Sequence, residues 1–178
     1  MMRKLARMLR RFRREDGNAT VEFVILFPFF IGLFGSAFEA SLISTRQVLL
    51  NSAVDRVTRE YQLGNYGSPT HGELKVILCN LVGFIPDCTS SLTIELERID
   101  RTDFAFNTGQ IQCSDRDNEI EPVTTFENAG SGDFMLMTVC AVFRPMVPIT
   151  GLGLKLPKVN GGNYYGLYAT TAFVVEPA

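Results

Sequence analysis

The hydrophobic pattern begins with one long apolar stretch. From Phe23 to Phe38, sixteen consecutive residues are uncharged and most are apolar. The stretch reaches the roughly 20 residues needed to cross about 30 Å of hydrocarbon only if Glu22 and Glu39 are counted with it. The pattern therefore predicts a membrane-spanning helix over residues 18–42, with a carboxylate near each end.

The helical pattern continues past this span without a helix breaker. Its apolar positions then follow the i, i+4, i+7, i+11 spacing of one helix face, at Leu50, Val54, Val57 and Tyr61. Helix-ending residues follow at Gly64, Asn65, Gly67 and Pro69. The sequence predicts one helix from about residue 18 to residue 63, roughly 69 Å long, whose second half, residues 43–63, is amphipathic.

Pro28 lies inside the predicted span. It removes a backbone donor and is expected to kink or locally open the helix, at a cost of about 3 kcal/mol in an ordinary helix interior. Two interpretations stay open. Pro28 marks either a tolerated kink in an ordinary membrane anchor or a helix that packs against other helices and loosens when it leaves the bilayer.

Residues 68–178 show a different pattern, with frequent Gly and Pro turns. A short amphipathic helix is predicted over residues 73–82, and β-strands over residues 92–98, 134–143 and 164–175. Three or four antiparallel strands laid on the amphipathic half of the long helix would bury a sufficient core, which predicts an α+β fold. Apolar residues 135–137 and 145–157 fit either ordinary core and loop or a contact surface.

Charge separates the two ends of this 178-residue chain. The net charge of −2 conceals a first segment, residues 1–17, with seven basic and two acidic residues and hence +5. The remaining chain has ten basic and seventeen acidic residues and a net charge of −7. With 46% apolar residues and one spanning stretch, the composition excludes a disordered chain, a collagen-like fibre and a polytopic membrane protein.

A basic segment before an apolar run is typical of membrane targeting, since cationic residues stay on the cytoplasmic side. Nucleic-acid binding is disfavoured, because the positive charge stops at an apolar segment and the rest of the chain is acidic. We expect no nucleic-acid partner. A solvated tail without a targeting role is the other alternative.

The junction between the two segments reads R-R-E-D-G-N-A-T-V-E-F over residues 13–23. Gly17 follows a short basic leader, and Glu22 and Phe23 are the fifth and sixth residues after it. This pattern resembles the cleavage site of type IV pilin-like proteins, and the Glu-Phe pair is similar to that of the tight-adherence (Tad) subfamily. The run V-E-F-V-I-L-F-P, with Glu39 about one span later, resembles the TadE-like minor pilins, or pseudopilins.

The resemblance implies that a prepilin peptidase cuts between Gly17 and Asn18 and removes residues 1–17. Glu22 would then be the fifth residue of the mature chain, and its carboxylate would set subunit register by pairing with the N-terminal amine of a neighbour. A carboxylate in an apolar helix bundle needs such a partner; a Glu that snorkels to the headgroups is the alternative.

The same resemblance implies a pilin-like α+β fold and a structural, non-enzymatic role in Tad pilus assembly or initiation, and so in adhesion and biofilm formation. The implied partners are other Tad pilins and pseudopilins, the inner-membrane Tad assembly platform and the membrane. The chain would start in the bacterial inner membrane, with residues 68–178 outside the cytoplasm, and move to the pilus. The sequence does not separate a TadE from a TadF type.

An ordinary secretory signal peptide is the main alternative. Residues 35–37, Gly-Ser-Ala, provide a small-x-small cleavage site after an apolar region over residues 21–34. The mature product would then start near Phe38 and be a secreted or membrane-anchored extracytoplasmic binding module. Glu22, Pro28 and the helical pattern that continues past the site argue against this alternative.

All four cysteines follow the apolar segment, at Cys79, Cys88, Cys113 and Cys140. If that segment crosses the membrane once, they face an oxidising compartment in which disulfides persist. Of the three possible connectivities, we favour the sequential one, which ties the short helix to the next strand and a loop to a core strand. Zinc is disfavoured, because no C-x-x-C or Cys/His spacing occurs.

No catalytic constellation is found in the sequence, so neither an enzyme nor a cofactor is predicted. His71, the single histidine, is expected in a surface turn. Asp115, Asp117 and Glu119 alternate as at the start of a calcium loop, but Ile120 occupies the sixth position, where an EF-hand requires Gly. Whether the acidic segment from residue 115 to 121 binds calcium stays open.

Overall fold

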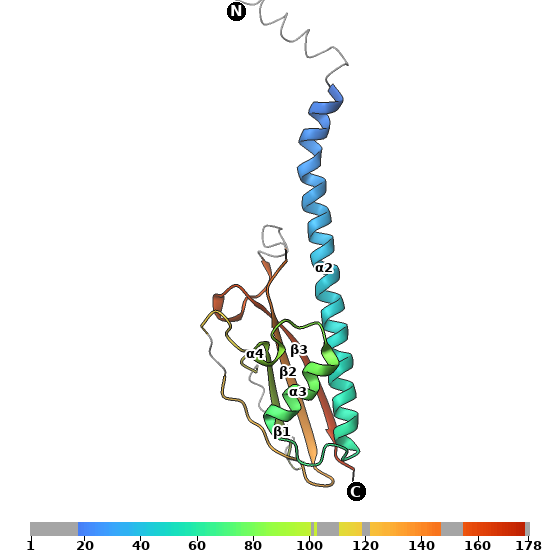
Figure 1. The fold of residues 1–178 in the computed structure, drawn as a ribbon, viewed down its shortest axis with the longest axis vertical. Coiled ribbons are helices and arrows are strands. Elements are labelled where there is room, and N and C mark those ends of the chain that lie inside the picture. Colours follow the sequence, from blue (N-terminus) through green and yellow to red (C-terminus); the bar gives the residue numbers. More distant parts are fainter. Residues whose placement is uncertain (1–17, 101, 103–110, 119–121, 147–154, 177–178) are drawn as a thin grey trace, which may run out of the picture.

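A computed structural model describes residues 18–100, 102, 111–118, 122–146 and 155–176. One long helix, α2 (Asn18–Gln62), has its C-terminal half packed against a small sheet domain, while its N-terminal half projects away from the domain (Figure 1). Residues 1–17, including Gly17 of the predicted cleavage site, lie outside the described residues.

The helix α2 is continuous over 45 residues, a length of about 68 Å at 1.5 Å per residue. It runs through Pro28 without interruption and ends one residue before the predicted boundary. The chain then turns at Gly64 and Gly67, whose φ angles of 73° and 62° lie in the left-handed region that glycine adopts readily. One helix therefore passes from the apolar stretch into the domain.

The short helix α3 (His71–Val82) begins two residues earlier than the sequence pattern predicts, because Thr70 caps it. The Thr70 side chain accepts a hydrogen bond from the backbone N–H of Glu73, and the Glu73 side chain accepts one from the Thr70 backbone. The hydrogen bonds that the Glu73 carboxylate accepts from the Thr70 backbone N–H and from the Thr70 hydroxyl lower the pKa of Glu73. Gly83, with a φ of 62°, ends the helix.

The sheet is an antiparallel meander with the strand order β1-β2-β3. Its strands are β1 (Leu92–Arg98), β2 (Phe134–Phe143) and β3 (Tyr165–Val174), and the one-turn helix α4 (Cys88–Ser91) directly precedes β1. Ile94 pairs with Val139, which pairs in turn with Ala169. The predicted α+β fold and its three strands are confirmed, with end points shifted by at most one residue.

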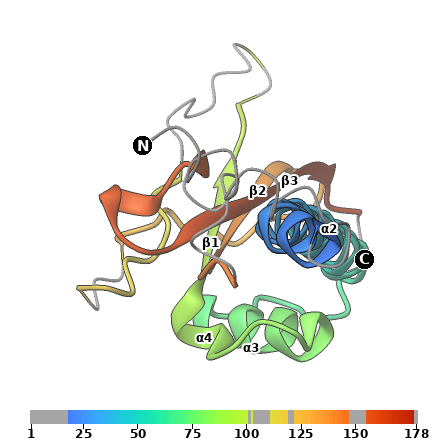
Figure 2. The same ribbon diagram turned by 90° about the horizontal axis from the view of Figure 1, so that it is seen from above.

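One face of the sheet forms the core with α2 and α3, which lie on the same side of it (Figure 2). Every second residue of each strand points to this face and packs against helix residues that recur about every 3.6 positions. The predicted helix face of α2 is confirmed as core, since its four apolar residues are at most 4% exposed: Leu50, Val54, Val57 and Tyr61. Met135 and Met137 of β2 are fully buried and thus belong to the core.

The opposite face of the sheet carries a second, smaller cluster around a disulfide. Cys113 is bonded to Cys140 of β2, and Ile111 and Val142 pack beside the bond. The other disulfide joins Cys79 of α3 to Cys88 at the start of α4. Both bonds confirm the predicted sequential pairing of the cysteines.

Core packing of α2 predicts a sharp contrast between two adjacent leucines. Leu50 is fully buried, whereas Leu49 is 44% exposed. We expect Leu50→Ala to lower the free energy of unfolding by about 2–5 kcal/mol and Leu49→Ala to change it by less than about 0.5 kcal/mol. Urea unfolding of the detergent-solubilised chain, followed by near-UV circular dichroism, measures both. Equal losses in the two variants would contradict this packing.

The two disulfides are expected to differ in their contribution to stability. Cys113 and Cys140 are separated by 27 residues, and Cys79 and Cys88 by 9. In the chain-entropy model the longer loop stabilises more, by about 4 kcal/mol against about 3 kcal/mol. Unfolding of the double alanine variant of each pair tests this order. A larger loss on removing the shorter loop would show that strain or packing outweighs loop entropy.

Candidate assembly interface and membrane span

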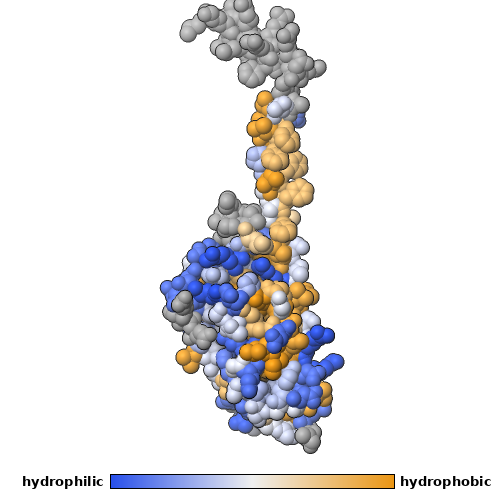
Figure 3. Space-filling view, viewed as in Figure 1, coloured by the Kyte–Doolittle hydropathy of each residue, from blue (hydrophilic) through white to orange (hydrophobic). Residues whose placement is uncertain are grey.

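The N-terminal half of α2 exposes large apolar side chains on all sides. Twelve are between 45% and 69% exposed: Val21, Phe23, Val24, Ile25, Leu26, Phe27, Phe29, Phe30, Ile31, Leu33, Phe34 and Phe38. The projecting helix is mostly orange and tan, whereas the domain below it is blue and white with smaller orange patches (Figure 3). A helix that is apolar all round requires lipid or other helices around it. By length and composition, α2 is the one helix in the described part of the chain that could cross a membrane.

Glu22 lies on this exposed apolar surface, within the second turn of α2. Within the described residues it has neither a hydrogen bond nor an ion pair. Phe23 beside it is 61% exposed, and its ring centroid lies 5.0 Å from that of Phe27. A carboxylate in such surroundings needs a partner when the helix leaves water. Any such partner must come from outside the described part of this chain.

Glu39 has a different environment from Glu22. Its side chain is fully buried, and its two carboxylate oxygens accept hydrogen bonds from the backbone N–H of Met146 at 3.1 and 3.3 Å. The bond ties α2 to the segment that follows β2, at the end of the domain nearest the apolar half of the helix. Sequence position suggests that the two carboxylates are equivalent, one near each end of a single span. The structure separates them into one exposed and one buried group.

The spacing of Glu39 from the buried residues of α2 could have identified it as buried. Glu39 precedes Leu50 by eleven residues, and partly buried Ile43 lies between them at i+4 from Glu39. All three therefore occupy the helix face that packs on the sheet. This spacing can be read from the sequence, but the backbone group that Glu39 binds is 107 residues away in the chain.

An aromatic and cationic cluster follows Glu39 along the helix. Arg46 donates a 2.7 Å hydrogen bond to the hydroxyl of Tyr165, and its guanidinium lies 4.7 Å from the ring centroid of Phe143. Burial raises the pKa of Tyr165, Arg46 opposes that rise, and the negative charge of Glu39 adds to it. The cluster locks the start of β3 and the end of β2 onto α2.

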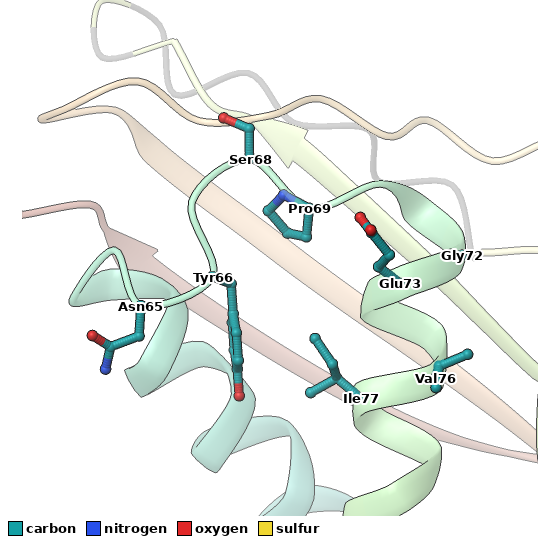
Figure 4. Close-up of a pocket in the computed structure, with 8 residues that line it drawn as sticks. All are labelled: Asn65, Tyr66, Ser68, Pro69, Gly72, Glu73, Val76 and Ile77. Atoms are coloured by element: carbon teal, nitrogen blue, oxygen red, sulfur yellow. The ribbon is translucent and has the colours of Figure 1, made fainter.

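A hollow of about 690 Å³ lies between the end of α2 and α3 (Figure 4). The rings of Tyr66 and Pro69 and the side chain of Ile77 line it. Glu73, the one carboxylate among the lining residues, is held by the Thr70 cap. Burial, followed by the charge of Glu60, raises the pKa of Tyr66. The lining pairs no base with a nucleophile.

The remaining residues considered for chemistry differ in how they are held. His71 was expected in a surface turn but is the partly buried first residue of α3, with its ring edge-on to Phe126 at 5.3 Å. Its Nε2 is buried and has no hydrogen-bond partner among the described residues. The Asp115 carboxylate accepts hydrogen bonds from the side-chain amides of Asn118 and Asn160 and from two backbone N–H groups, and these bonds lower its pKa. Residues 119–121 lie outside the described part. Among the described residues, no three His, Cys, Asp or Glu side chains are grouped as metal ligands.

Comparison with known protein families identifies a relationship for the helical region. A family model described as TadE-like protein matches residues 17–59. The match includes Gly17, the whole apolar half of α2 and most of its amphipathic half, and it confirms the resemblance found from residues 13–28 and Glu39. Residues 60–178 lie outside the match. No curated protein and no solved structure matches the chain.

The Glu39 contact predicts a local change on substitution. Losing a buried hydrogen bond to a charged acceptor costs about 1.5–3 kcal/mol, so Glu39→Ala should speed hydrogen exchange of the Met146 amide at least roughly tenfold. Asp55→Ala removes an exposed carboxylate from the same helix and should leave that amide unchanged. NMR hydrogen exchange in detergent measures both. An unchanged Met146 rate in Glu39→Ala would contradict the contact.

Proposed function

We propose that the chain is a structural minor pilin, or pseudopilin, of a Tad-type pilus, processed by a prepilin peptidase after Gly17. The observation that carries the proposal is the long helix α2, whose N-terminal half exposes twelve large apolar side chains and whose C-terminal half holds a folded domain. The match of residues 17–59 to the TadE-like family supports it.

The exposed half of α2 suits two successive environments. In the inner membrane its side chains are surrounded by lipid, and in an assembled pilus they pack against the helices of neighbouring subunits. Burying each large side chain is worth about 1.5–3 kcal/mol relative to water, so the helix exchanges one apolar environment for another without exposure. Pro28 lacks a backbone N–H, and this weak point lets the helix open locally during extraction.

Glu22 makes the packing between neighbouring α2 helices in the pilus specific for one relative position. An unpaired charge at the centre of a bilayer or bundle is costly, so packing is favoured only where a cation meets the carboxylate. Cleavage after Gly17 creates that cation, the α-amine of Asn18, four residues from Glu22. Pairing of Glu22 with the amine of a neighbouring subunit then sets the axial register.

The domain after α2 is displayed outside the cytoplasm in this proposal. Its two disulfides suit an oxidising compartment, and the basic residues 3–14 favour a cytoplasmic N-terminus. The domain would contact sister pilins and the inner-membrane assembly platform, and through the pilus it would support adhesion and biofilm formation.

A secreted or anchored binding module with an ordinary signal peptide is the competing function. Its cleavage site would lie at residues 35–37, which are helical and continuous with the turns on either side. Cleavage there would also leave Glu39, which is fully buried against the domain, at the second residue of the product. Neither feature favours a processing site at that point.

The experiment that tests the proposal is the intact mass and N-terminal sequence of the chain purified from native membranes, with and without the prepilin peptidase. We expect an N-terminus at Asn18 that depends on the peptidase. A start near Phe38, or an uncut Met1 when the peptidase is present, would overturn the proposal and leave the binding module as the better explanation.

Substitution of Glu22 tests the register role separately. We expect Glu22→Ala to be cut normally after Gly17 but to reduce assembled pili at least roughly tenfold, because the neighbour's amine loses its partner. Glu22→Asp keeps the charge and should assemble better than Glu22→Ala. Pilus yield in sheared fractions, normalised to processed subunit in the membrane, measures this. Normal piliation with Glu22→Ala would contradict the role.

A further inference from the structure

A second hollow, of about 360 Å³, lies at the end of the domain nearest the apolar half of α2. Three arginines line it, Arg46 from α2, Arg116 from the segment before β2, and Arg144 just after β2. Asp87 is the one carboxylate among the lining residues. The lining side chains therefore carry an excess of two positive charges, although residues 18–178 as a whole are acidic. Glu39, whose buried carboxylate binds the backbone N–H of Met146, lies beside the hollow but is not among its lining residues.

The single carboxylate, that of Asp87, is already paired with one of the three arginines. Arg116 forms an ion pair with Asp87 at 3.1 Å and donates a 2.6 Å hydrogen bond to the hydroxyl of Ser91. Within the described residues, neither Arg46 nor Arg144 forms an ion pair. The excess charge therefore belongs to these two arginines.

Both unpaired guanidinium groups are held in place by aromatic rings. Arg46 lies over Phe143 and donates to the Tyr165 hydroxyl, while Arg144 lies 5.1 Å from the ring centroid of Tyr164. A guanidinium has five N–H donors in a planar fork that matches the oxygens of a phosphate. Stacking orients the fork without using all of these donors, so the hollow is preorganised for an anion.

The level of the hollow along α2 indicates where that anion comes from. Arg46 lies four residues, about 6 Å along the helix axis, beyond residue 42, the predicted end of the span. The headgroup layer on each side of a bilayer is roughly 5–8 Å thick, and helical side chains tilt toward the N-terminus, here toward the membrane. Met146, which also lines the hollow, is 61% exposed and adds an apolar contact at this level.

We propose that this hollow binds the phosphate of an anionic phospholipid headgroup in the bilayer that α2 spans, through Arg46 and Arg144. The bound headgroup complements the two unpaired cations and holds the end of the domain against the membrane surface. Tyr164 faces the same hollow and suits the interfacial level that aromatic residues favour. The inference rests on the proposed insertion of α2 into a membrane.

The test is a titration of phosphatidylglycerol and of phosphatidylcholine into the detergent-solubilised full chain, with lipid adducts counted by native mass spectrometry. We expect a one-to-one adduct that favours phosphatidylglycerol. Because one basic residue near an anionic surface contributes about 1 kcal/mol, Arg46→Gln and Arg144→Gln should each weaken the adduct about fivefold. Arg46→Lys, which keeps the charge, should weaken it less than Arg46→Gln.

Matched controls exclude a general effect of charge or of misfolding. Arg56→Gln and Arg59→Gln remove the same charge from exposed positions of α2 farther from the span and should leave the adduct unchanged. Arg144 is exposed, so Arg144→Gln should keep the thermal midpoint of the parent chain. A loss of lipid with an unchanged midpoint then reports on the hollow itself.

Three outcomes would overturn the inference. They are equal retention of the two lipids, equal weakening by the control variants, and displacement of the lipid by millimolar inorganic phosphate, which would identify a site for free phosphate. The same spectra report the N-terminus of the chain. A chain that starts near Phe38 counts against the proposed function, whereas an intact helix that retains no phosphatidylglycerol counts against the lipid site alone.

Discussion

Packing of one face of α2 against the sheet is the contact on which the rest of the structure depends. Leu50, Val54 and Val57 on that face are at most 1% exposed. Because the helix is continuous, this packing also sets the direction in which the N-terminal half of α2 leaves the domain. The domain thereby holds an apolar rod of about 20 residues that it cannot itself cover. One half of this helix packs in a protein core, whereas the other half exposes apolar side chains that suit a membrane or a helix bundle.

Where the two halves of α2 meet, polar side chains of the helix bind the domain, and no flexible linker separates the halves. Glu39 binds the backbone after β2, and Arg46 binds Tyr165 at the start of β3. A flexible joint would let the domain tilt relative to α2. These two contacts instead extend the region of α2 that is bound to the domain by about three turns, from Leu50 back to Glu39. If α2 is inserted as we propose, they keep the domain at a set height above the bilayer, where Arg144 reaches the headgroups.

Sequence patterns predicted most of the fold because its elements are local and strongly periodic. The apolar run, the i, i+4, i+7 face of α2 and the alternation in Leu92–Arg98 each specify an element without distant contacts. The start of α3 was missed by two residues because Thr70 supplies a side-chain cap there. The exposed apolar half of α2 and Glu22 could equally be found from the sequence, since the Glu22–Phe23 pair and the apolar run after it are contiguous in the chain.

By itself, the sequence determined the long helix, its exposed apolar half, the strands and the family resemblance, because each depends on residues close together in the chain. The tertiary structure alone decided that Glu39 is buried against Met146 and that Arg46, Arg116 and Arg144 line one hollow. The physical reason is distance along the chain. A buried charge or a cluster of like charges is defined by its neighbours, and these neighbours come together only when the sheet packs on α2.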